Sequence, residues 1–111
     1  MQTLSFSGHE FEVIWKDPEG DIFLTDIGGN IPKGVKVRCG LRQGCCYTPG
    51  THRFEVIVRV LKGQGLFLLH DRAILYQKGS RFVVPAYTAH SFVKVEKDTI
   101  FTKEAESLEP R

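Results

Sequence analysis

Short apolar segments with an alternating pattern dominate the chain. They are rich in β-branched and aromatic residues, and turn signals such as "DPEG" at 17–20 separate them. No segment carries apolar residues at helical spacing over several turns. We expect strands at 3–7, 11–15, 21–26, 35–39, 45–48, 54–61, 66–69, 73–77, 81–84, 91–95 and 99–103. So many short strands in 111 residues predict an all-β fold, an antiparallel double-sheet jelly-roll barrel, because an open sheet of that size would leave exposed edges.

Length and charge indicate the number of domains and exclude some kinds of partner. We expect one domain, 1–111, which is long enough to bury a core. The formal net charge of +2 is scattered, which argues against nucleic acid and against an anionic membrane as partners. No apolar run approaches the roughly 20 residues of a membrane span. The first residues lack the pattern of a signal peptide, so we expect a cytoplasmic protein.

The cysteines give no sign of a disulfide framework. Cys39, Cys45 and Cys46 leave one thiol unpaired in any pairing scheme, and no C-x-x-C pair is present. We therefore expect reduced, mostly structural thiols.

Alternation assigns faces to the segment that follows the adjacent cysteines. From 52 to 60 the even-numbered residues are His52 and then only apolar side chains, whereas Glu55, Ile57 and Arg59 share the other face. The apolar face must line the barrel interior. His52 is therefore predicted to point inward at the mouth of the core, unless a β-bulge reverses the parity.

The stretch "LFLL" at 66–69 is apolar on both faces, and Ile57 adds to its outer side. An apolar outer face in a small barrel needs a cover. We expect a homodimer to supply it. The alternative is that the N-terminal strands wrap over it.

Glycine, proline and histidine recur at fixed spacings in two segments, 44–63 and 79–94, separated by 15 residues. The residues in register are Gly44, His52, Gly63, Gly79, Pro85 and His90. Six matches in one frame, in an all-β chain of this size, resemble the two motifs of the cupin superfamily. The resemblance is to a small, single-domain, RmlC-like cupin. It implies a jelly-roll barrel whose metal, when present, lies inside near one end.

The departures from the cupin motifs concern the metal ligands. The first motif usually supplies two histidines and a glutamate, and here Gly50 and Val56 replace one histidine and the glutamate. Only His52 and His90 remain, whereas a transition metal generally needs three or more protein ligands. Two imidazoles alone would hold zinc, iron or manganese weakly. If the segment stays regular, the thiol of Cys46 would also face inward by parity, and the three residues together would suit zinc or copper. In the second motif Tyr87 and Lys94 replace a glycine and an asparagine.

Three functions remain open at this point. The first is a protein that binds a small molecule near His52 and His90, with Tyr47 and Tyr87 lining the mouth and a histidine acting as acid or base. The second is a metal-dependent enzyme of dioxygenase or isomerase type that uses both histidines, with Cys46 or water completing the metal's ligands. The third is a structural or interaction dimer whose histidines are satisfied in the core.

Overall fold

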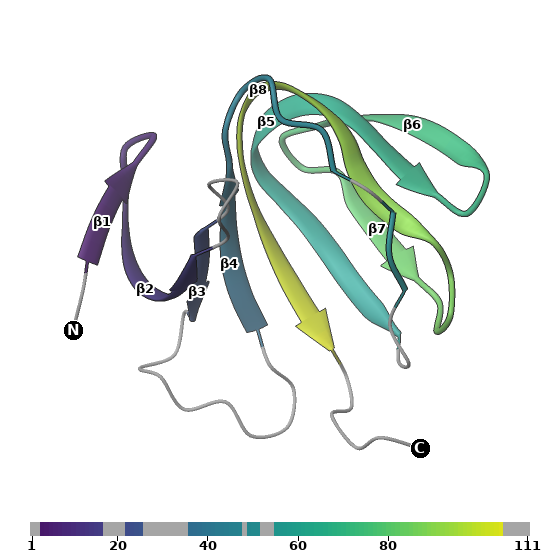
Figure 1. Ribbon diagram of the computed structural model, residues 1–111, viewed down its shortest axis with the longest axis horizontal. Helices are drawn as coiled ribbons and strands as arrows, with labels where there is room; N and C mark the ends of the chain where they lie inside the picture. The colour runs from purple at the N-terminus through teal and green to yellow at the C-terminus, as the bar shows by residue number, and fades with distance from the viewer. Residues whose placement is uncertain (1–2, 17–21, 26–35, 48, 52–54, 106–111) are drawn as a thin grey trace.

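The computed structural model describes residues 3–16, 22–25, 36–47, 49–51 and 55–105, and within these ranges the chain is all-β without a helix (Figure 1). The predicted fold class is confirmed. The strands are β1 (Thr3–Phe6), β2 (His9–Lys16), β3 (Ile22–Thr25), β4 (Lys36–Leu41), β5 (Val56–Leu69), β6 (Arg72–Gln77), β7 (Arg81–Val84) and β8 (His90–Ala105).

Antiparallel pairing joins the strands in the order β1-β2-β3-β4-β8-β5-β6, and β7 pairs with β5. Two long strands, β5 and β8, pair with each other and with most of their neighbours: β5 also pairs with β6 and β7, and β8 also pairs with β4. Residues 56–59 of β5 pair with β7, whereas residues 64–69 pair with β6. In the same way β8 pairs with β4 over 99–104, whereas its first half bonds to the segment 44–50 through backbone hydrogen bonds. Figure 1 shows β5 and β8 curving side by side. Their bend separates two layers: one contains β4, the second half of β8, the first half of β5 and β7, and the other contains the first half of β8, the second half of β5 and β6.

The long strands correct the predicted boundaries. The segments 54–61 and 66–69 were expected as separate strands with a turn at 62–65, but Val56–Leu69 is one strand with register shifts between Val60 and Gly65. Likewise 91–95 and 99–103 belong to the single strand β8. The glycines of "KGQG" therefore mark an irregular bend inside a strand and not a hairpin, because an interior glycine permits a bulge as readily as a turn.

At the bend of β5 the backbone passes close to β8. Gly63 has φ 115, and a Cβ added there would lie 2.7 Å from the Cα of Thr99 and 2.8 Å from the carbonyl oxygen of Asp98. The Thr99 hydroxyl donates to the carbonyl of Lys97 at 2.9 Å, so the Tyr76 hydroxyl donates to Thr99 Oγ1 at 2.7 Å. Tyr76 is buried, and this burial raises the pKa of its phenol. The bend is thus fixed by backbone contact and by a buried hydrogen-bond chain.

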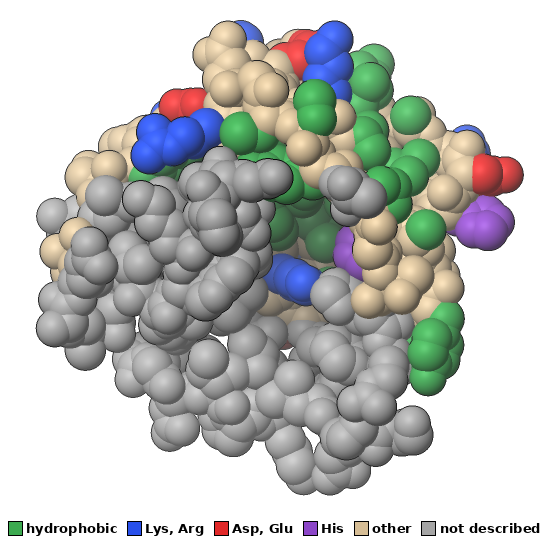
Figure 2. Space-filling view, viewed as in Figure 1, with side chains coloured by type: hydrophobic (Ala, Val, Ile, Leu, Met, Phe, Trp, Pro, Cys, Tyr) green, Lys and Arg blue, Asp and Glu red, His purple; other side chains and the backbone are tan. Residues whose placement is uncertain are grey.

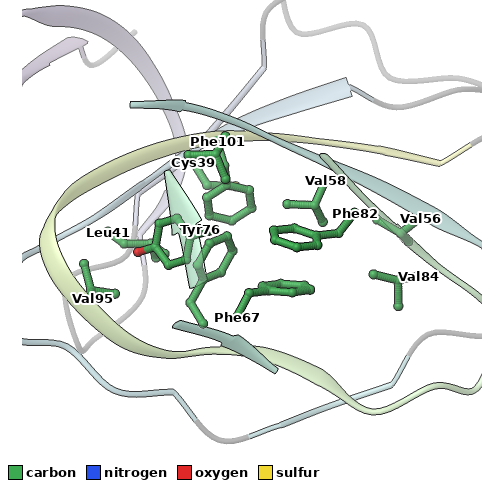
Figure 3. Packing of buried hydrophobic residues seen from close by; sticks show 12 residues of the cluster. Cys39, Leu41, Val56, Val58, Phe67, Tyr76, Phe82, Val84, Val95 and Phe101 are labelled. Carbon is green, nitrogen blue, oxygen red and sulfur yellow. The ribbon is translucent and has the colours of Figure 1, made fainter. Parts of the chain in front are cut away.

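The core lies between the layers and includes stacked aromatic rings (Figure 3). Phe67 of β5 stacks on Phe82 of β7 with ring centroids 4.4 Å apart, and it meets Phe92 of β8 edge-on at 5.0 Å. The predicted inward face of β5 is confirmed, since Val56 and its two alternating successors are almost fully buried. Among the described residues, the buried members of this cluster are Cys39, Leu41, Val56, Val58, Val60, Phe67, Tyr76, Phe82, Val84, Phe92, Val95 and Phe101.

The two ends of the strand order, β1 and β6, differ in how well their apolar side chains are covered. A Cβ added to Gly40 of β4 would lie 2.9 Å from Phe6, so β1 packs closely against β4. At the other end, Leu75 of β6 pairs with Leu66 of the apolar stretch and is 73% exposed. The homodimer that was expected to cover this stretch remains a prediction.

Candidate functional site

His90 is the first residue of β8 and lies at the edge of the aromatic core. Its backbone exchanges two hydrogen bonds with Gly50, His90 N to Gly50 O at 3.0 Å and Gly50 N to His90 O at 3.1 Å. Its ring Nδ1 lies 3.1 Å from the carbonyl oxygen of Thr88. A carbonyl only accepts, so Nδ1 carries the hydrogen and Nε2 carries the lone pair of the neutral ring. The ring is partly buried, with its centroid 6.3 Å from that of Phe67.

The surroundings of His90 favour its neutral form. Burial lowers the pKa of the imidazole below its ordinary value, because removal from water disfavours the charged ring. The positive charge of Lys103 lowers the pKa further, whereas the carbonyls of Thr88 and Gly50 act in the opposite direction. A neutral histidine on an apolar floor is able to accept a proton or a hydrogen bond near neutral pH.

This lowered pKa predicts a loss of stability in acid. The unfolded chain takes up a proton at His90 near pH 6.5, whereas the folded chain resists protonation until the pH is lower. The free energy of unfolding should therefore fall as the pH drops from 6.5 through the folded pKa. Urea titrations at several pH values should show a smaller loss over this window in His90→Gln than in the parent. Equal slopes in the two proteins would contradict the lowered pKa.

Lys103 is a further residue of the site, and the sequence analysis did not identify it. It pairs with Val58 of β5, which is buried, and it follows the core residue Phe101 by two positions. Directly paired residues of antiparallel strands share a face, as do residues two apart on one strand. Lys103 therefore points into the barrel. Burial lowers the pKa of its amine, and Cys39 acts in the opposite direction.

The bend of β8 brings His90 and Lys103 together. They are 13 residues apart in one strand, which in a straight strand corresponds to about 43 Å. At that distance their charges would be screened by salt. The charge of Lys103 nevertheless acts on the His90 ring, because β8 curves from one layer into the other. The sequence does contain one indication of this residue: Lys103 follows Phe101 by two positions in a strand, so its side chain shares the inward face of Phe101.

Figure 2 shows a hollow on one face of the molecule. A histidine side chain and a lysine or arginine side chain are visible within it, together with hydrophobic side chains. The described part of the site thus combines an imidazole, a cation and an apolar floor.

The structure places the other predicted ligand-binding residues differently. Tyr47 packs against the core cluster, and its carbonyl accepts a hydrogen bond from the Ser91 hydroxyl at 2.9 Å. Tyr87, three residues before His90, is 68% exposed and has φ 59. A tyrosine is strained in this left-handed region, where the motif has glycine. His52 lies outside the described residues, so its inward orientation remains a prediction.

Cys46 does not face inward as its parity predicted. Cys45 and Tyr47 pack against the core, whereas Cys46 between them is exposed. Cys39 is buried, and none of the three cysteines forms a disulfide. The expectation that Cys46 would turn inward and complete a metal site therefore loses its basis.

The described residues fit a metal ion poorly. Among them, no group of three or more His, Cys, Asp or Glu side chains is arranged to hold one. Gly50 lies directly opposite His90 and supplies no ligand, and Val56 is a core residue. The nearby ammonium of Lys103 also opposes a divalent cation at His90 by charge repulsion.

Comparison with solved structures identifies the fold. An RmlC-like cupin from Shewanella frigidimarina superposes with a TM-score of 0.70 at 20% identity, over 98% of this chain and 97% of that one. A double-stranded β-helix protein from Klebsiella pneumoniae gives 0.71 at 11% identity over 87% and 85%. A predicted oxalate decarboxylase from Thermotoga maritima gives 0.65 at 20% identity over 80% of each chain. The protein has the cupin fold, a jelly-roll barrel of antiparallel strands.

Sequence comparison adds no closer relative. No family model matches the chain, and no curated protein matches it either. In the part of the chain described here, no helix combines the length and the hydropathy needed to cross a lipid bilayer.

Proposed function

We propose that this cupin-fold chain binds a small organic molecule inside its barrel beside His90, without a full set of metal ligands. The observation that carries the proposal is the environment of His90. Its ring is partly buried at the edge of the aromatic core and is oriented by the carbonyl of Thr88. Small-molecule sites typically combine an apolar lining with a few fixed polar groups, and this end of the barrel has both.

His90 has two roles in this proposal. Its neutral ring accepts a hydrogen bond from the ligand, or it takes a proton from the ligand if the protein is an enzyme. His52 joins it from the first motif, as the resemblance to cupins implies. Tyr47 contributes to the apolar wall, and the exposed ring of Tyr87 stacks on a planar ligand at the mouth.

A metal-dependent enzyme is the second candidate function. A predicted oxalate decarboxylase shares the fold at 20% identity, and His52 and His90 keep the positions of two cupin metal ligands. The metal-dependent function is opposed by the glycine at position 50, the valine at position 56 and the cation at position 103. Zinc, iron, manganese or copper would have only His52 and His90 from the motifs.

Metal analysis of protein purified without chelators separates the candidates. We expect less than stoichiometric metal in the parent. His52→Ala and His90→Ala should remain folded, with free energies of unfolding within about 1 kcal/mol of the parent, because binding residues contribute little to folding. The matched control is His70→Asn, in an exposed turn with φ 60, which asparagine tolerates.

Two other outcomes would reject the proposal. Stoichiometric metal that is lost in both alanine variants would establish the metal-dependent function. Losses above about 2 kcal/mol in both variants would show that the histidines are structural, since a buried polar network that loses one partner is destabilised by that order.

A further inference from the structure

Lys103 presents a cation to the barrel interior from a position where most side chains are apolar. Its register partner Val58 is 2% exposed, and Phe101, on the same face of β8, is 7% exposed. The lysine side chain itself is largely shielded from solvent. Chains of this size seldom bury a lysine unless it is paired, because desolvation of the ammonium is costly.

The described residues provide no carboxylate for this ammonium; burial lowers its pKa, and the group that acts in the opposite direction is the buried thiol of Cys39. Among the described residues, Cys39 and His90 interact electrostatically with Lys103. His90 is neutral or positive, so it cannot neutralise a lysine. Within the described ranges no carboxylate forms an ion pair with Lys103, whereas the more exposed Lys94 on the same strand pairs with Glu96 at 3.6 Å. No carboxylate of the described residues therefore competes with a ligand for this cation.

We propose that Lys103 binds the carboxylate of a small, apolar-bodied acid in the barrel, with the body of the acid over the aromatic floor near Phe67 and His90. This inference rests on the proposed binding function and names the class of ligand. A single cation beside a histidine that burial keeps neutral matches one negative charge, which favours a carboxylate over a doubly charged phosphate. Phe67 and Phe82, stacked at 4.4 Å, supply an apolar surface.

Benzoate and benzamide are a matched pair of probes, because they share a ring and differ in charge. Binding is measured at constant ionic strength from the shifts of the His90 and Phe67 NMR resonances during titration. We expect benzoate to bind the parent about tenfold or more tightly than benzamide, as a charge-assisted hydrogen bond predicts. Lys103→Met removes the charge at similar length, and it should reduce this ratio to less than about twofold.

Lys97→Met is the control, because Lys97 is an exposed lysine of the same strand. It should leave the preference for benzoate unchanged. Lys103→Met should also melt at or above the temperature of the parent, since it removes a shielded charge without removing a partner. A lower melting temperature for Lys103→Met would indicate that the lysine serves folding, and it would overturn the inference.

The failures of the two proposals are distinguishable. Equal binding of benzoate and benzamide to the parent, or an unchanged preference in Lys103→Met, would overturn the carboxylate site and leave the proposed binding function standing. If neither probe shifts the His90 or Phe67 resonances at tens of millimolar, both proposals fail for ligands of this size.

Discussion

Gly63→Ala is expected to lower the free energy of unfolding by about 3 kcal/mol or more. Two effects add at this position. The backbone has φ 115, which L side chains rarely adopt, and the new methyl would lie 2.7 Å from the Cα of Thr99. Backbone atoms cannot rotate away as a flexible side chain can, so β5 and β8 would have to separate at the bend. Urea unfolding followed by circular dichroism measures the effect.

Gly79→Ala is the matched control for this prediction. Gly79 has φ 91, but a Cβ added there meets no atom within 4 Å. Its substitution should cost only the backbone strain, about 1 kcal/mol. Similar losses in the two variants would show that the contact with Thr99 relaxes easily, and that the bend does not depend on close packing at Gly63.

Gly50→His is expected to create a metal site. Gly50 and His90 exchange both backbone hydrogen bonds, so their side chains share a face at neighbouring positions. A Cβ at position 50 meets nothing within 4 Å, so the new side chain has room. A histidine there would place two imidazoles side by side. Calorimetric titration with Zn²⁺ should show at least about tenfold tighter binding than the parent, because each added imidazole is a further ligand.

Two further variants test the origin of this gain. Gly50→Gln matches the added bulk without an imidazole and should bind Zn²⁺ like the parent. Addition of Lys103→Met to Gly50→His should tighten binding again, because the ammonium repels a divalent cation. The expectation is wrong if Gly50→His gains no affinity, since that would mean that the side chains at 50 and 90 do not converge.

Much of the fold could be predicted from local pattern. Alternation in the segment that became β5 correctly placed Val56 and its alternating successors inside and Arg59 outside. The pattern failed where a strand bends, because "KGQG" has the same composition in a turn and in a bulge. It also failed at Cys46, because parity counted back from His52 requires a regular strand, and the described residues 45–47 do not belong to one.

The candidate site was predictable only in part. His90 is recognisable from its spacing to Gly79 and Pro85, and Tyr87 adopts φ 59 at the position where the motif has a glycine. Lys103 escaped notice because its role depends on β8 folding back toward His90. Its parity with Phe101 indicates an inward side chain, but no local pattern encodes the approach to His90.

The sequence by itself determined the all-β class, the inward face of the first half of β5 and the position of His90 in a cupin-like register. These properties depend on residue type and on spacings of a few residues, which the backbone translates directly into local geometry. Only the tertiary structure decided that β5 and β8 each pass through both layers, that Cys46 faces outward and that Lys103 shares the interior with His90. Such features depend on pairing between distant strands and on a bend where Gly63 meets Thr99, and that contact joins segments 36 residues apart.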